Sequence, residues 1–225
     1  MENAKKISSR SLVLMVVGAL VLFGLGAVGI VQSSRAQLAH FSEQYVAGIA
    51  QSHLGVNLTE NGKIVEGEDA LLGQMLAGDS QMVPGKKYAE ALSVQNDTDM
   101  GEYVRLTVRK YWETADGVKT PAIDPALIEL ISESDDWVLS GSECTDERLV
   151  FYYKHELGPH ESAATPAVSD IMIAPRALGM DINARVALSA QVDSVQTSYA
   201  VDAAKSAWGV DVRTLGLAWN EGASE

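Results

Sequence analysis

The sequence predicts an all-β fold, an antiparallel β-sandwich or barrel, because short stretches of alternating apolar and polar residues recur between turn residues. Residues 103–112 are the clearest example: Val104, Leu106 and Val108 alternate with polar neighbours, as in a half-buried strand. Five further stretches show the same period: residues 54–58, 88–95, 149–153, 171–173 and 186–192. Six or more short strands separated by Gly, Pro, Asn and Asp turns are typical of a sandwich or barrel.

Two stretches predict short helices instead. Residues 125–131 follow Asp124, a favourable N-cap, and begin with Pro125, which is well tolerated at the first helical position. Residues 199–208 are rich in alanine and are followed by Gly209, a common C-terminal cap. We therefore expect a β-sandwich with one or two short helices.

The N-terminus predicts export. Residues 12–31 are an unbroken apolar run that three basic residues precede and small residues follow, which is the pattern of a signal peptide. The run is also long enough to span a bilayer. Two outcomes follow: cleavage in the region of Ala36, Ala39 and His40, or retention of residues 12–31 as an N-terminal membrane anchor. Either way, we expect the rest of the chain to function outside the cytoplasm.

Length and charge define the remaining organisation. We expect residues 1–39 to form the signal or anchor, residues 40–52 an extended segment, and residues 53–225 one β-sandwich domain. The chain has a net charge of −13, and residues 1–39 carry +3, which leaves −16 on the exported part. Such acidity repels nucleic acid, so we expect no nucleic-acid partner. Cys144 is the only cysteine, so no intrachain disulfide forms.

Eight short pieces of the exported chain form an ordered set: residues 38–43, 56–60, 83–86, 94–98, 103–108, 151–154, 195–196 and 207–209. Taken in order, these pieces resemble the TasA/camelysin family of exported Gram-positive proteins. His40 departs from the aromatic residue that is more usual in that family's cleavage region. The resemblance implies a jelly-roll sandwich, removal of the signal by a signal peptidase, a location at the cell surface or in the biofilm matrix, and fibre assembly or a peptidase activity.

The residues themselves do not support a peptidase. His155, Glu156 and His160 resemble a zinc-peptidase motif, but the second histidine stands at i+5, whereas the motif requires i+4 on one helix face. Pro159 would also break such a helix. We therefore predict a loop with exposed histidines, no catalytic residue and no enzyme activity, and a secreted metalloendopeptidase remains an alternative through the resemblance alone.

Two acidic loops are candidate calcium sites. Residues 96–102 and residues 133–136 each concentrate carboxylate and amide oxygens, the ligands that Ca²⁺ prefers. Neither has the complete spacing of an EF-hand loop. Each is thus either a calcium site or an ordinary solvated loop, and we predict no other cofactor.

The leading functional hypothesis is a structural subunit. After processing, residues 40–51 would pair with an open sheet edge of the next copy, a mode in which main-chain hydrogen bonds supply the affinity. Such head-to-tail contacts propagate a filament. The alternatives are that residues 40–51 are only a linker, or that the protein is a monomeric surface-anchored binding module. Expected partners are copies of itself, the signal peptidase and, through residues 12–31, the membrane; the candidate anchors of the donor strand are Phe41, Tyr45, Val46 and Ile49.

Overall fold

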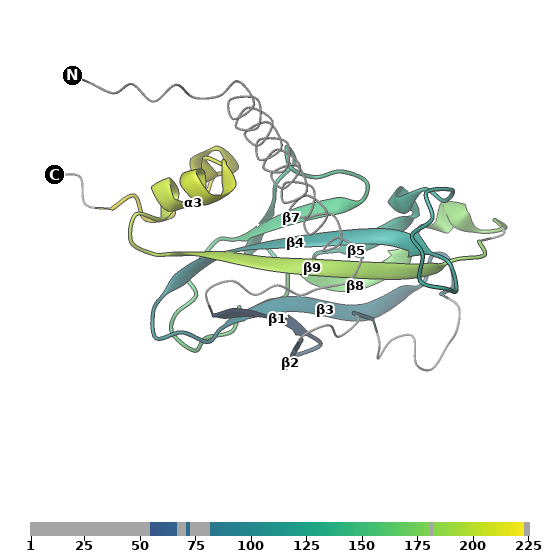
Figure 1. Cartoon of the computed structure of the whole chain (residues 1–225), viewed down its shortest axis with the longest axis horizontal. Helices are drawn as coiled ribbons and strands as arrows, with labels where there is room; N and C mark the ends of the chain where they lie inside the picture. The colour runs from purple at the N-terminus through teal and green to yellow at the C-terminus, as the bar shows by residue number, and fades with distance from the viewer. Residues whose placement is uncertain (1–54, 67–70, 73–81, 181, 223–225) are drawn as a thin grey trace, which may run out of the picture. The chain divides into compact units, whose positions relative to one another are not determined.

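A computed structural model describes residues 55–66, 71–72, 82–180 and 182–222, all of which belong to one compact unit, residues 48–225. They form two antiparallel sheets with one α-helix, consistent with the predicted all-β sandwich (Figure 1). The first sheet has the order β2 (Lys63–Ile64), β1 (Val56–Glu60), β3 (Lys87–Asn96), β8 (Val168–Ile173) and β5 (Ile128–Ile131). The second has the order β6 (Trp137–Leu139), β7 (Arg148–Tyr153), β4 (Glu102–Glu113) and β9 (Arg185–Gln196).

The core lies between the inner faces of the two sheets. Val104, Leu106 and Val108 of β4 are fully buried, and Leu188 and Val192 of β9 lie beside them. Each apolar side chain of this kind contributes about 1.5–3 kcal/mol when it leaves water. The period-two pattern therefore predicted both the strands and their inward faces, and strands are found within or overlapping all six predicted stretches.

The predicted helix over residues 125–131 is wrong beyond its first turn. Asp124 does cap the segment, since its carboxylate accepts a hydrogen bond from Ala126 N at 2.8 Å, but the 3₁₀ turn η1 ends at Leu127. Residues Ile128–Ile131 form strand β5 and pair with β8. A β-branched residue at each end of this stretch favours a strand, and pairing buries Ile128 completely.

The C-terminal segment covers part of the outer face of the second sheet. Helix α3 (Ala200–Trp208) ends at Gly209, which has a φ of +71°, as the sequence predicts. Beyond the 3₁₀ turn η3 (Val212–Leu215), Trp219 stacks on Tyr103 with ring centroids 4.6 Å apart. The indole Nε1 of Trp219 also donates to Tyr153 O at 3.2 Å. Residues of this segment and of the outer face of the sheet thus form a second apolar cluster.

None of the helices in the described residues is long and apolar enough to cross a membrane. The predicted signal or anchor, residues 12–31, lies outside the described part of the chain.

Candidate functional site

The four edge strands of the sandwich differ greatly in length. Strands β2, β6 and β5 contain two, three and four residues, whereas β9 contains twelve. Within the described residues, β9 pairs with β4 on one side and with no strand on the other. Short edges limit unwanted pairing, and a long edge presents a template for another strand. Strand β9 is therefore the best candidate for an interaction edge.

Backbone geometry shows which groups β9 presents. Lys110 N donates to Glu147 O at 2.8 Å, on the side of β7, so Lys110 directs its backbone groups away from its β9 partner Leu188. In an antiparallel ladder, both residues of such a pair direct their backbone N–H and C=O groups away from each other, and the pattern repeats every second residue. Leu188, Ala190 and Val192 therefore direct N–H and C=O to the open side of β9.

The side chains of this edge do not oppose strand addition. Residues 186–192 include no charge, proline or glycine, the residue types that commonly blunt sheet edges. The charged residues at either end are neutralised within the second sheet: Arg185 Nε lies 2.7 Å from Glu113 Oε1, and Arg105 Nη2 lies 2.7 Å from Asp193 Oδ2. The central stretch of β9 is consequently uncharged, and no described strand pairs with its outward side.

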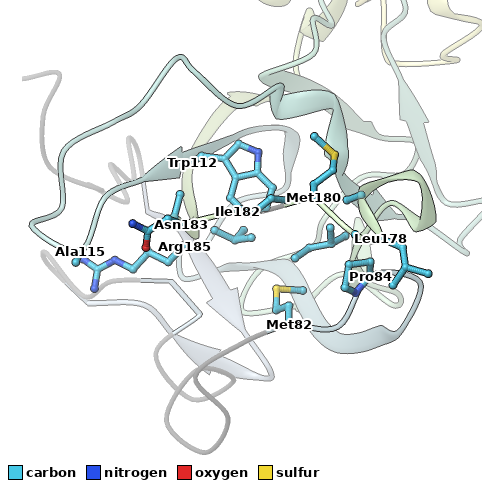
Figure 2. A pocket seen from close by; sticks show the side chains of 14 residues that line it. Met82, Pro84, Trp112, Ala115, Leu178, Met180, Ile182, Asn183 and Arg185 are labelled. Carbon is cyan, nitrogen blue, oxygen red and sulfur yellow. The ribbon is translucent and has the colours of Figure 1, made fainter.

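A pocket of mixed polar and apolar lining adjoins the beginning of β9. It encloses about 540 Å³ and includes Trp112 and Ile173 among the residues that line it. Figure 2 shows Met82, Pro84, Leu178 and Met180 gathered around it. Leu178 is 77% exposed and Met180 is 53% exposed, which is unusual for large apolar side chains. Arg185 and Val186 line the pocket and also begin β9, so the pocket and the open edge are continuous.

The histidine motif forms the predicted exposed loop. The side chains of His155 and His160 are each 60% exposed and bind carboxylates rather than one another. His155 Nε2 lies 3.2 Å from Asp136 Oδ1, and His160 Nε2 lies 3.1 Å from Asp99 Oδ1. No group of three or more His, Cys, Asp or Glu side chains in the described ranges is arranged to hold a metal ion.

In the acidic loop at residues 133–136, donor groups of the protein already bind two of the carboxylates. Glu133 lies 2.9 Å from Lys87 Nζ, and the Thr165 hydroxyl donates to Asp136 Oδ2 at 2.7 Å. The hydrogen bond from Thr165, followed by the one from His155, lowers the pKa of Asp136. These contacts favour the solvated-loop interpretation of this cluster.

A buried carboxyl group escaped the sequence analysis. Glu90 is fully buried on the inner face of β3, where Asn61 Nδ2 donates to its Oε2 at 3.2 Å. Burial, and then the neighbouring carboxyl of Glu60, raise the pKa of Glu90 to about 8. The glutamate is therefore protonated at neutral pH. The sequence did contain a signal for this burial. Side chains alternate between the two faces of a strand, so Glu90 lies on the same face of β3 as the buried residues Leu92 and Val94.

Other predicted residues lie in different situations. Cys144 is a partly buried free thiol whose Sγ accepts from Val150 N at 3.4 Å. The predicted cleavage region and donor anchors lie outside the described residues: Ala36, Ala39, His40, Phe41, Tyr45, Val46 and Ile49. Comparisons with protein-family models, curated proteins and solved structures found no match to this chain.

Proposed function

We propose that this protein is an exported structural subunit that assembles head to tail at the cell surface or in the biofilm matrix. Residues 40–51 of one copy would add as a strand to the open edge of β9 in the next copy. The observation that carries this proposal is the twelve-residue edge of β9, whose central residues 186–192 carry no charge, beside three edges of only two to four residues.

The length and pattern of the donor segment fit this edge. Twelve extended residues span about 40 Å, the same length as a twelve-residue strand. In an extended chain Phe41, Tyr45 and Ile49 share one face, because strand side chains alternate with a period of two. In the added strand, that face would point towards the opposite sheet. The two sheets lie close together there, because Cα atoms of β1 and β9 are within 8 Å of one another. An anchor at one end of the donor would occupy the pocket beside Arg185.

Processing would control assembly. Removal of residues 1–39 near Ala39 releases the donor, whereas retention of residues 12–31 keeps each subunit tethered to the membrane. The donor and the β9 edge are different surfaces, so their contact does not close on itself and a filament grows. We also propose a jelly-roll topology for the sandwich, supported by the passage of the chain between the two sheets at β3–β4, β4–β5, β5–β6, β7–β8 and β8–β9.

Two truncations test the proposal directly. A chain beginning at Phe41 should form filaments visible by electron microscopy, and a chain beginning at His53 should remain monomeric in sedimentation velocity. Adding a synthetic peptide of residues 40–51 to the shorter chain should give a one-to-one complex that does not polymerise. Equal assembly of the two chains would refute strand addition by this segment.

A further inference from the structure

At the end of the loop that joins β3 to β4 lies a buried carboxyl group, one oxygen of which has no hydrogen-bond partner. Glu102, the first residue of β4, is 3% exposed, and its Oε2 has no hydrogen-bond partner. Its backbone is held firmly, since Glu102 N donates to Leu157 O at 3.0 Å and Leu157 N donates to Glu102 O at 2.8 Å. No ion pair connects Glu102 to a basic side chain within the described part of the chain. Burying an unpaired carboxylate costs several kcal/mol.

The nearest polar neighbours of this carboxylate are oxygen atoms. Glu102 Oε1 lies 3.4 Å from Thr98 Oγ1, which lies 2.8 Å from Asn96 Oδ1 and 3.0 Å from Met100 O. Asn96 Oδ1 also accepts from Thr98 N at 2.9 Å, so the Thr98 hydroxyl is not its only donor. Asn96 is fully buried, and its Nδ2 donates to Met100 O at 2.7 Å and to Gly158 O at 2.9 Å, which directs Oδ1 towards Thr98.

We propose that the loop Asn96–Glu102 binds a calcium ion. Every second residue from Asn96 to Glu102 contributes an oxygen atom, the arrangement in which calcium loops use alternate positions, and the set combines one carboxylate with amide, hydroxyl and carbonyl oxygens. The ion would supply the partner that Glu102 Oε2 lacks. Other than Glu102, the ligands are neutral, so no cluster of carboxylates is required.

The surroundings of the loop add negative potential. Asp97 and Asp99 are exposed on the same loop, and the carboxylate of Glu156 lies against Gly101 so closely that a Cβ there would meet Glu156 Oε1 at 2.0 Å. Calcium accepts an irregular set of six to eight oxygens, with water completing it, whereas Mg²⁺ requires near-octahedral geometry and loses water reluctantly. The loop should therefore select Ca²⁺ over Mg²⁺, with a dissociation constant of about 10⁻⁴–10⁻³ M, as in extracellular modules.

Bound calcium would fasten the two sheets together. The loop leaves β3 in the first sheet and enters β4 in the second, and it also contacts Leu157 and Gly158 of the histidine loop. A ligand that binds only the folded state stabilises it in proportion to RT ln(1 + [L]/Kd). For a chain of this size, calcium at ten times Kd should raise Tm by about 3–6 °C.

The full-length chain in mild detergent provides the test. Calcium titration should show saturable binding by calorimetry and the expected rise in Tm, while MgCl₂ at equal ionic strength should leave Tm almost unchanged. Glu102→Gln, which is isosteric and uncharged, should remove both responses. Asp135→Asn, which removes one charge from the other acidic loop, should keep them.

Thr98→Val provides a second variant if Glu102→Gln does not fold, and it should weaken calcium binding at least tenfold. Absence of binding to the wild-type chain would overturn the proposal, as would an equal response to magnesium. An unchanged response of Glu102→Gln would do the same. The test is independent of filament assembly, because it uses the unprocessed chain.

Discussion

Strands β9 and β5 are both edge strands, but they differ in length and in the contacts of their outward backbone groups. Strand β5 stops after four residues, and its outward Ile128 O accepts a hydrogen bond from Lys110 Nζ. Strand β9 continues for twelve residues, and no other strand among the described residues pairs with the outward backbone groups of Leu188, Ala190 and Val192. The two edges therefore differ in length and in whether their outward backbone groups have partners among the described residues.

The largest expected effect comes from proline at the open edge. Ala190→Pro removes an outward N–H without removing a ladder hydrogen bond to β4, a placement that edge strands tolerate. It should abolish filament formation by the chain beginning at Phe41, as measured by electron microscopy and sedimentation.

The matched control is Leu130→Pro, which removes an outward N–H from β5. Ala174 N donates to Leu127 O at 2.7 Å, so Leu130, like Ile128, turns its N–H away from β8. This variant should assemble normally. If both prolines block assembly, or neither does, the distinction between the two edges is wrong.

Removing the aromatic cover of the second sheet should affect folding rather than recognition. Trp219 is 3% exposed and packs on Tyr103, so Trp219→Ala should lower the free energy of unfolding by about 3–5 kcal/mol. Urea denaturation of the chain beginning at His53 measures this loss. Trp208→Ala, at a half-buried position in the same cluster, should cost less; a larger loss there would contradict our description of the cover.

Proton binding by Glu90 should make stability depend on pH. The pKa of Glu90 is raised to about 8 by burial and by Glu60, so the folded state binds more protons than the unfolded state between about pH 5 and 8. The free energy of unfolding should then fall as pH rises through this range, by up to about 1.4 kcal/mol per pH unit. Urea denaturation at a series of pH values should show that Glu90→Gln flattens this slope and that Glu66→Gln, at an exposed position, keeps it. A steep slope in Glu90→Gln would assign the effect to another group.

The smallest expected effect concerns the ion pair between β4 and β9. Asp193 accepts from Arg105 at 2.7 Å and both side chains are largely buried, so Asp193→Asn should lower the free energy of unfolding by about 1–2 kcal/mol. Asp116→Asn, in an exposed turn, should change it little. Thermal denaturation measures both, and filament assembly of the chain beginning at Phe41 should survive the change at Asp193.

Local pattern predicted most of the sandwich, because strands with one buried face have a period of two. It failed where tertiary pairing decided the outcome: residues 128–131 became a strand only through contact with β8. It also missed the burial of Glu90 and Lys110, which lie on the inward faces of their strands. Burial lowers the pKa of Lys110.

The candidate site was less predictable than the fold. Residues 186–192 were recognised as a strand, but whether a strand lies at an edge depends on the order of strands in the sheet, which a single stretch does not encode. The pocket likewise brings together Met82, Pro84, Trp112, Ile173 and residues 177–180 and 182–186, which come from separate parts of the chain.

Hydrogen exchange in the assembled filament tests the central claim most directly. The amides of Leu188, Ala190 and Val192 have no described strand partner in the subunit, so they should exchange rapidly in the chain beginning at His53 and become strongly protected in filaments of the chain beginning at Phe41. Rapid exchange of these three amides in well-formed filaments would contradict strand addition at β9.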